Sequence, residues 1–227
     1  TLRQSLIPGL LNTVGYNVAR KQKDLKLVEI GRVFFGSGDD NVQPKEILYL
    51  SAALTGEERA TKWLKDSREL DFYAAKGYLE VALEYLGLEQ KVTYKKLTID
   101  GMHPGRTAEV YLGEERIGLI GEVHPLVAEK LGLNRTYVFE INLDKVISED
   151  KVKPKYEEVT KYPEITRDIA MLVDLEDEYQ NIYNTIENVN SKLITNIELF
   201  DLYVGLELVA GKKSLALTIT YSDKEKT

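Results

Sequence analysis

Cysteine is absent from this sequence of 227 residues, which excludes a disulfide framework and any thiolate metal site. Histidine occurs only twice, and the spacing of His103 and His124 fits no common zinc motif. We expect each imidazole to form a structural hydrogen bond near the proline that follows it. No apolar run approaches the roughly 20 residues that span a bilayer, and no charged and apolar leader opens the sequence. These absences favour a cytoplasmic protein that does not enter a membrane.

An excess of basic residues is also lacking, since the formal net charge is −7. Residues 155–227 contain 8 basic and 14 acidic residues, whereas residues 1–154 contain 22 and 23, so the last third carries most of the imbalance. Non-specific binding to nucleic acid needs a basic surface that displaces counterions from phosphates. Any RNA contact in the last third must therefore be local and guided by shape.

The motifs of common active sites are missing as well. Gly36–Gly38 could suggest a phosphate loop, but the next two residues are aspartates, which repel phosphate. Gly211–Ser214 is similar to the end of a Walker motif, but Gly205 lies at the wrong spacing and a strand pattern follows. We interpret Gly211–Ser214 as a hairpin turn, and we predict no catalytic and no metal-binding residue.

Apolar periodicity predicts alternating helices and strands over the first two thirds of the chain. Residues 47–54 are apolar without alternation, which is typical of a strand covered on both faces, whereas the alternation in 137–143 indicates a half-buried strand. The first helix should bury Leu11, Val14 and Val18. The expected helices begin near Pro8, at Asp71 and after Pro125, and the expected strands are 27–35, 47–54, 92–99, 108–112, 116–123 and 137–143.

Residues 148–163 lose this periodicity and contain two prolines and many charges, which is typical of a linker. We therefore divide the chain into a first domain of residues 1–150, a linker of residues 151–162 and a second domain of residues 163–227. In the second domain the pattern predicts a strand at 168–173, a helix bearing Ile182, Ile186, Val189 and Leu193, and strands at 197–203 and 215–221. A ferredoxin-like unit needs a further helix and strand, so we expect an incomplete domain with an exposed sheet edge.

Three groups of segments carry a family resemblance. They are LRQSLIPGLL with VEIGRVF, then MHPGRTAEVYLGEERIGLIGEVHP, and finally YPEITRDIA with ELFDLYVG and GKKSLALTITY. In this order and spacing they resemble the β-subunit family of bacterial phenylalanyl-tRNA synthetases over essentially the whole chain. Met102 departs from the family, in which an aromatic residue is common at that position. The departure concerns local packing only.

The resemblance implies an α+β fold. The first domain would be class II synthetase-like, with a mixed, mostly antiparallel sheet and flanking helices. The second would be most of a ferredoxin-like anticodon-binding domain, a partial βαββ unit cut short at its C-terminal end.

The same resemblance implies that the first domain has lost its chemistry. A catalytic core of this class has an arginine after the Gly-Arg-Val-aromatic strand to bind the ATP α-phosphate, whereas Phe35 follows Phe34 here. It also has glycines and an arginine near the later strand, where this sequence has Glu140 and Asp144, and these carboxylates would repel a triphosphate. We therefore expect an inactive scaffold that binds no cofactor itself, with ATP and Mg²⁺ used by the whole enzyme.

The family further implies that the chain binds a catalytic α subunit in an α2β2 heterotetramer and helps to position tRNA(Phe). The first helix and the strand Val28–Phe35 are candidate contacts with the α subunit, but their apolar residues could equally fill the domain's own core. Gly105–Arg106 could form a turn with an internally paired arginine, which we favour over a ligand role.

For RNA binding the candidates are Arg167, Tyr203, Lys212 and Lys213, because aromatic rings stack on unpaired bases and cations bind phosphates. Each has a structural alternative, since Tyr203 could end a buried strand and the lysines could decorate a turn. Two other functions stay open at this point: a freestanding RNA-binding or regulatory relative without a catalytic partner, and a small-molecule enzyme on the same scaffold.

Overall fold

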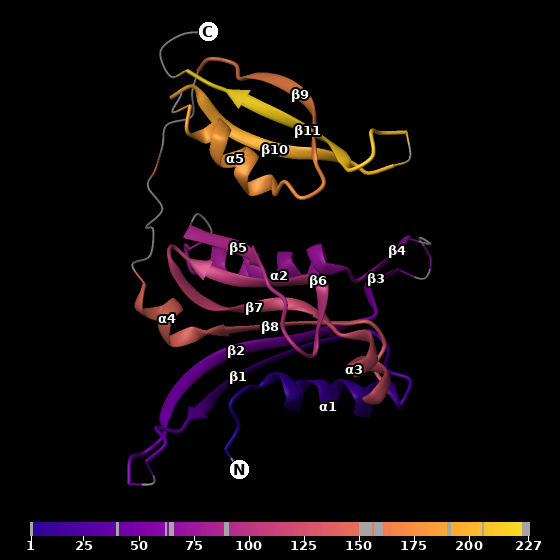
Figure 1. Cartoon of the computed structure of the whole chain (residues 1–227), viewed down its shortest axis with the longest axis vertical. Coiled ribbons are helices and arrows are strands. Elements are labelled where there is room, and N and C mark those ends of the chain that lie inside the picture. The colour runs from indigo at the N-terminus through magenta and orange to yellow at the C-terminus, as the bar shows by residue number, and fades with distance from the viewer. Residues whose placement is uncertain are drawn as a thin grey trace. The chain divides into compact units, whose positions relative to one another are not determined.

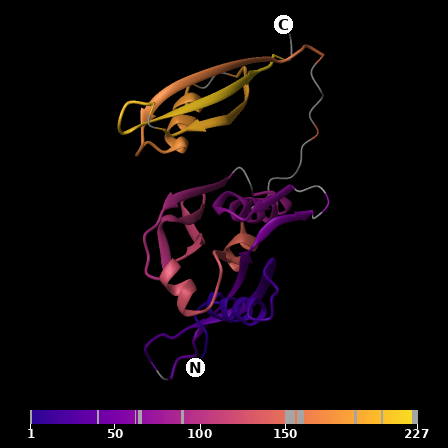
Figure 2. The same cartoon turned by 90° about the vertical axis from the view of Figure 1, so that its right-hand side faces the viewer.

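The computed structural model describes residues 2–39, 41–61, 63, 66–88, 91–149, 156, 161–189, 192–205 and 207–223. The chain divides into two compact units, residues 1–154 and residues 155–227, which are described separately (Figures 1 and 2). Most of the predicted linker, residues 151–162, lies outside the described residues.

A six-stranded sheet forms the centre of the first unit (Figure 1). Its strands follow the order β1-β2-β8-β7-β6-β5, and every pairing among them is antiparallel. The mostly antiparallel sheet is thus confirmed, but no parallel pair makes the sheet mixed within the described residues. The strands are β1 (Leu25–Phe35), β2 (Lys45–Thr55), β5 (Val92–Lys96), β6 (Met102–Leu112), β7 (Glu115–Val123) and β8 (Thr136–Asn142).

One face of this sheet is covered by helix α2 (Phe72–Tyr85). The Asp71 carboxylate caps this helix by accepting a hydrogen bond of 2.7 Å from the Ala74 N–H. Leu79 and Leu83 are fully buried and belong to the same core cluster as Phe139 of β8. This side holds the larger of the unit's two apolar clusters.

The opposite face is covered by α1 (Ile7–Val18) and α3 (Pro125–Lys130). Leu11 and Val14 of α1 are buried against this face, and Val18 packs on them half-buried. The predicted apolar stripe of the first helix is therefore confirmed as core.

With helices on both faces of the sheet, the burial of β8 and of β2 differs from the sequence predictions. All seven residues of β8 are buried, so a half-buried strand is wrong. The alternation reflects two covered faces of different polarity, because Glu140 and Asn142 are buried with polar partners rather than exposed to water. In β2, only Ser51–Thr55 is buried, so the expected cover on both faces holds for the second half of that strand.

Sequence periodicity missed three short elements of the first unit. They are the hairpin of β3 (Glu57–Thr61) and β4 (Asp66–Glu69), and helix α4 (Leu143–Ser148). Helix α4 follows β8 directly and is capped by the Asn142 side chain, whose Oδ1 accepts a hydrogen bond of 3.0 Å from the Lys145 N–H. Six residues are too few to show a helical repeat.

The second unit has the predicted β-α-β-β order: β9 (Ile165–Asp174), α5 (Tyr179–Glu187), β10 (Ile194–Tyr203) and β11 (Lys212–Tyr221). The sheet order is β10-β11-β9 with antiparallel pairs, so β9 pairs with β11 alone among the described strands. Its buried apolar side chains are Leu215, Leu217 and Ile219, which share one face of the central strand. No helix in the described part of the chain is long and apolar enough to cross a membrane.

Candidate functional site

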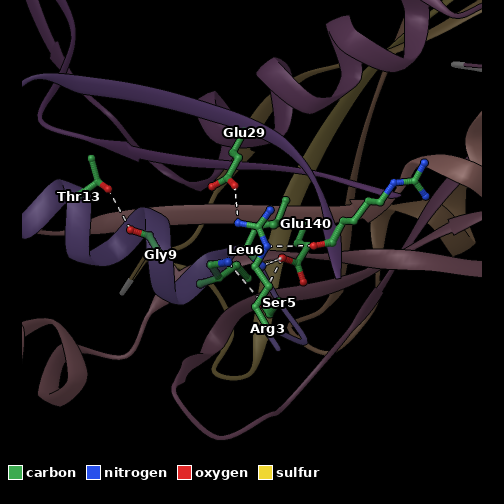
Figure 3. A network of polar contacts seen from close by, with 9 residues as sticks. Arg3, Ser5, Leu6, Gly9, Thr13, Glu29 and Glu140 are labelled. Carbon is green, nitrogen blue, oxygen red and sulfur yellow. Dashed lines mark hydrogen bonds and ion pairs between the residues drawn. The ribbon is translucent and has the colours of Figure 1, made fainter. Parts of the chain in front are cut away.

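Glu140 lies in the middle of β8 and caps the first helix (Figure 3). Its Oε1 accepts hydrogen bonds from the Leu6 N–H at 2.7 Å and from the Ser5 hydroxyl at 3.0 Å. Helix α1 has no capping side chain at its own first position, so this distant carboxylate satisfies the helix end and complements its dipole. Burial raises the pKa of Glu140, although the hydrogen bonds from Leu6 and Ser5 oppose that shift.

The segment before α1 is tied to the edge strand β1 by Arg3 (Figure 3). The Arg3 Nη1 lies 2.6 Å from Glu29 Oε1, and its Nε donates to the Arg32 carbonyl at 2.9 Å. The Phe34 N–H donates to the Arg3 carbonyl at 2.9 Å. These bonds hold the start of the chain against the strand that carries the Gly-Arg-Val-Phe segment.

The two carboxylates expected to repel phosphate have structural partners instead. Glu140 binds the start of α1, and Asp144 Oδ2 accepts a hydrogen bond of 2.9 Å from the Leu48 N–H. Neither residue lines the cleft that lies beside Phe35. Both carboxylates accept hydrogen bonds from backbone N–H groups of the chain itself, and their expected repulsion of a triphosphate stays a prediction.

The cleft beside Phe35 has a volume of about 380 Å³ and combines aromatic with cationic side chains. The residues that matter most here are Phe35, Lys45, Tyr49, Arg116, Asn142 and Lys145, and we name the cavity they line the Phe35 cleft. Lys45 is the register partner of Phe35 across the β1–β2 pair. The sequence prediction that this place offers only a ring and acids is wrong, since three cations line it.

Sequence reasoning missed these cations for an identifiable reason. Lys45 starts β2, Arg116 lies in β7, and Lys145 lies in α4. The three residues are far apart in the sequence and lie in three separate elements. Only the strand order β2-β8-β7 brings the three elements to one place.

Arg106 has the predicted internal partner. Its Nη1 lies 2.8 Å from Glu122 Oε2, and the Glu122 side chain is only 5% exposed. The hydrogen bond and charge of Glu122 raise the pKa of Arg106. The expected turn is wrong, however, because Gly105–Arg106 lies inside β6 at a register shift opposite β7. Burial raises the pKa of the neighbouring Tyr137 to about 12, so its hydroxyl stays protonated beside Glu122.

Both histidines make the predicted structural hydrogen bonds. His103 Nδ1 accepts from the Gly105 N–H at 3.0 Å, and His124 Nδ1 accepts from the Leu126 N–H at 3.2 Å. The second bond caps α3. No cluster of potential metal ligands occurs among the described residues.

The two predicted α-subunit contacts differ in burial. The apolar stripe of α1 lies in the unit's own core, which supports the structural alternative for that helix. In β1, by contrast, Val28 is 64% exposed and Ile30 is 61% exposed. Their register partners are Ala52 and Leu50 of β2, so the two side chains share one face of the sheet edge. Val28 and Ile30 are thus an accessible apolar pair of the first unit, and the exposed Lys26 and Arg32 flank them on the same face.

Three of the four predicted RNA contacts come together in the second unit. Tyr203 ends β10 opposite Ser214, and Lys212 and Lys213 immediately precede Ser214 in β11. Tyr203 is exposed, so the alternative of a buried strand end is wrong. Arg167 is paired with Ile219, about 17 Å along the strand from Ser214 at roughly 3.3 Å per residue.

The lysines at this end of the sheet already have partners. Lys212 Nζ lies 2.7 Å from Asp174 Oδ1, and Lys213 Nζ donates to the Leu175 carbonyl at 3.1 Å and to the Asp177 carbonyl. Gly211 has a φ of 81° that favours glycine, but a turn over Gly211–Ser214 is wrong for the last three residues, which lie in β11. The alternative in which the lysines decorate a turn is wrong, because both lie in β11, and Tyr203 is an exposed ring near them.

Comparison with known proteins identifies relatives of both units. Residues 1–143 match the family described as phenylalanyl tRNA synthetase beta chain CLM domain, and residues 160–227 match the ferredoxin-fold anticodon binding domain. The chain is 45% identical over its full length to a phenylalanine–tRNA ligase beta subunit of Staphylococcus haemolyticus (strain JCSC1435) and 41% identical to one of Staphylococcus aureus (strain USA300). It covers 28% of the length of each.

Among solved structures, a pyrrolysyl tRNA synthetase of Desulfitobacterium hafniense is similar over 64% of this chain and 48% of that chain. The sequence identity is 14% and the TM-score is 0.43, values too low to support an argument about fold or function.

Proposed function

Because the chain belongs to the phenylalanyl tRNA synthetase beta chain family, we propose that it acts as part of the β subunit of a phenylalanine–tRNA ligase. In this role it pairs with an α subunit and helps to position tRNA(Phe), while it performs no chemistry itself. The observation that carries the proposal is the succession of two family domains in one chain, with full-length similarity to named β subunits. The ferredoxin-fold match identifies the second domain as the anticodon-binding kind.

We further propose that residues 1–150 form a class II synthetase-like core without activity, that residues 151–162 link it to the second domain, and that residues 163–227 contact the anticodon region. The whole enzyme would be an α2β2 heterotetramer in the cytoplasm, where translation takes place, and would use ATP and Mg²⁺ in its α subunit. The loss of the motif arginine at Phe35 supports the inactive assignment, since a ring lacks the donors that bind a phosphate.

The proposed contact with the α subunit is the exposed face of β1. Val28 and Ile30 are apolar, lie on one face and are not used by the unit's own core. Depletion of charge at the centre of a contact surface is typical of protein interfaces. Helix α1 is not proposed, because its apolar stripe is consumed within the unit.

For RNA we propose Tyr203 as the main stacking residue, with Lys212, Lys213 and Arg167 as weaker contacts. Stacking of a base on an exposed ring tolerates an acidic surrounding better than phosphate binding does, because it does not depend on charge. Lys212 and Lys213 would have to exchange internal partners for phosphates, which lowers their net contribution.

A replacement experiment tests the proposed function. In the β subunit of Staphylococcus haemolyticus, the matching region is deleted or replaced by this chain, and each version is combined with the α subunit of the same organism. We expect deletion to abolish charging of tRNA(Phe) with phenylalanine and replacement to restore it. The isolated chain should show no phenylalanine-dependent exchange between ATP and pyrophosphate.

Two results would contradict the proposal. Exchange by the isolated chain would show that it has its own active site. Failure of the chain to bind an α subunit in a pull-down, together with tight binding to RNA, would favour a freestanding RNA-binding relative. That alternative is not favoured by the β-subunit names of the relatives.

A further inference from the structure

The Phe35 cleft has the size and walls of a small-molecule site. Its volume of about 380 Å³ falls in the range of roughly 300–1,000 Å³ that is typical of ligand pockets. Phe35, Ile47, Tyr49 and Ile117 supply apolar and aromatic surface. A planar ring can pack against such side chains, because aromatic groups favour stacked or edge-on contacts.

The cations of the cleft are only partly neutralised by the chain. Arg116 Nε lies 2.8 Å from Glu109 Oε1, and Lys145 Nζ lies 2.6 Å from Glu115 Oε1. The Lys45 ammonium has no ion pair or hydrogen bond among the described residues. Arg116 and Lys145 are thus each paired with a carboxylate, and Lys45 is the cation of the cleft that has no such partner among the described residues.

Neutral donors accompany this charge. Burial raises the pKa of Tyr49, with a smaller contribution from Glu140, so the phenol stays protonated near neutral pH and can donate a hydrogen bond. The Asn142 Oδ1 is committed to the cap of α4, which leaves the amide nitrogen as the group that can serve a ligand. Cationic and neutral donors around an apolar wall are the combination that fixes the orientation of an anionic ligand.

We propose that the Phe35 cleft binds a small organic anion in which a planar ring carries a phosphate or a carboxylate group. The ring packs against Phe35 and Tyr49, and the anionic group accepts hydrogen bonds from Lys45 and from the other cations. Charge-assisted bonds of this kind are stronger than neutral ones, and phosphate and carboxylate oxygens both suit them. The site binds without any chemical step, and it does not depend on tRNA charging.

Calorimetric titration of the 227-residue chain tests this site with four probes. Adenosine 5′-monophosphate carries ring and phosphate, benzoate carries ring and carboxylate, and inorganic phosphate and adenosine each carry one half of the proposed ligand. We expect at least one ring-bearing anion to bind with a millimolar or lower Kd and more tightly than either half. Whichever of adenosine 5′-monophosphate and benzoate binds more tightly shows whether the site prefers a phosphate or a carboxylate.

A charge-reversal pair locates the binding. Lys45→Glu should lower the affinity for the favoured probe by about tenfold or more. The substitution replaces the unpaired cation by a carboxylate, which has the same sign of charge as the ligand and repels it. Lys96→Glu makes the same change in net charge on the exposed side of β5, outside the lining of the cleft, and should leave the Kd unchanged. Lys45→Gln should give an intermediate loss, and equal melting temperatures would show that the variants fold.

Three results would overturn the proposal. The first would be that neither ring-bearing anion binds at millimolar concentration. The second would be that inorganic phosphate binds as tightly as the ring-bearing probes. The third would be that Lys45→Glu and Lys96→Glu reduce the affinity equally. The last result would assign the binding to the net charge of the chain rather than to this cleft. Loss of affinity in Tyr49→Phe would add that the phenol donates to the ligand.

Discussion

Strands β8, of 7 residues, and β9, of 10 residues, have opposite surroundings. Every residue of β8 is buried between the helices of the first unit, whereas β9 has no fully buried residue in the second unit. In the first unit, α1, α2, α3 and α4 cover the sheet from two sides. In the second unit, α5 is the only helix among the described elements. The difference teaches that a helix on each face, rather than strand composition, decides how much of a sheet is buried.

This contrast divides the molecule by function. The first unit has an apolar core on each face of its sheet and leaves the Phe35 cleft and the side chains of Val28 and Ile30 in β1 accessible. The second unit has a small core around Leu215, Leu217 and Ile219 and exposes large side chains such as Phe200 and Tyr203. Small units bury a smaller fraction of their surface and have less stability to spare. Substitutions should therefore have different consequences in the two units.

The largest expected effect compares one buried leucine in each unit. Leu79→Ala and Leu217→Ala should each lower the free energy of unfolding by about 3 kcal/mol, through lost burial and a cavity. In the second unit this loss should unfold the domain, while the first unit persists. Chemical denaturation followed by circular dichroism should then show two separate transitions. A single cooperative transition in both variants would show that the units unfold together.

The next effect concerns the cap that Glu140 provides to α1. Glu140→Ala should lower the free energy of unfolding of the first unit by about 2 kcal/mol, because the Leu6 N–H loses its acceptor. Glu140→Gln keeps an oxygen acceptor and avoids the burial of a charge, so it should cost much less. The denaturation midpoint of each variant at pH 8 reports its stability. An equal loss of stability in the two variants would contradict a role of Glu140 as the cap of α1.

The same residue predicts a pH dependence. Burial raises the pKa of Glu140 above its ordinary value of 4.5, so the folded state holds its proton more tightly than the unfolded state. The contribution of this group to stability is complete below pH 4.5 and is lost as pH rises through the raised folded pKa. Relative to Glu140→Gln, the wild-type chain should become less stable over that window. A constant difference across the window would show that the carboxylate is not desolvated.

A smaller effect is expected at the exposed edge of the first unit. Ile30→Glu should weaken binding to an α subunit by about tenfold, or 1.4 kcal/mol, because it places a charge in an apolar contact. Stability of the isolated chain should not change, since Ile30 is exposed. Val81→Glu in α2 is the matched control, because Val81 has a similar exposure and the same residue is introduced. Equal binding of the two variants in a pull-down or by calorimetry would remove β1 from the interface.

The smallest effect is expected on RNA binding by the second unit. Tyr203→Ala should lower the affinity for tRNA(Phe) by about fivefold, or 1 kcal/mol, through the loss of one stacking surface. Lys213→Ala should have less effect, because its ammonium is bound to the Leu175 and Asp177 carbonyls. Filter binding at two salt concentrations distinguishes the loss of a stacking contact from the loss of a phosphate contact, since stacking depends little on salt. A larger loss for Lys213→Ala than for Tyr203→Ala would reverse the proposed ranking.

The sequence alone was sufficient for most elements and for their order. The buried stripe of α1, the start of α2 at Asp71 and the β-α-β-β order of the second unit follow from patterns over a few residues, which any segment carries within itself. The family resemblance, carried by motifs such as MHPGR and YPEITRD, likewise needed no coordinates. Arg106 was predicted to have an internal partner, although Glu122 could not be named as that partner.

Tertiary structure decided what the charged residues do. Glu140 caps a helix whose first residues lie 134 positions earlier, and Lys45, Arg116 and Lys145 meet in one cleft only because β2, β8 and β7 are neighbours in the sheet. The two-sided burial of β8 depended in the same way on helices from distant parts of the chain. Periodicity reports which side of its own element a residue occupies, whereas the partner on that side is set by strand order and register, and these are properties of the whole fold.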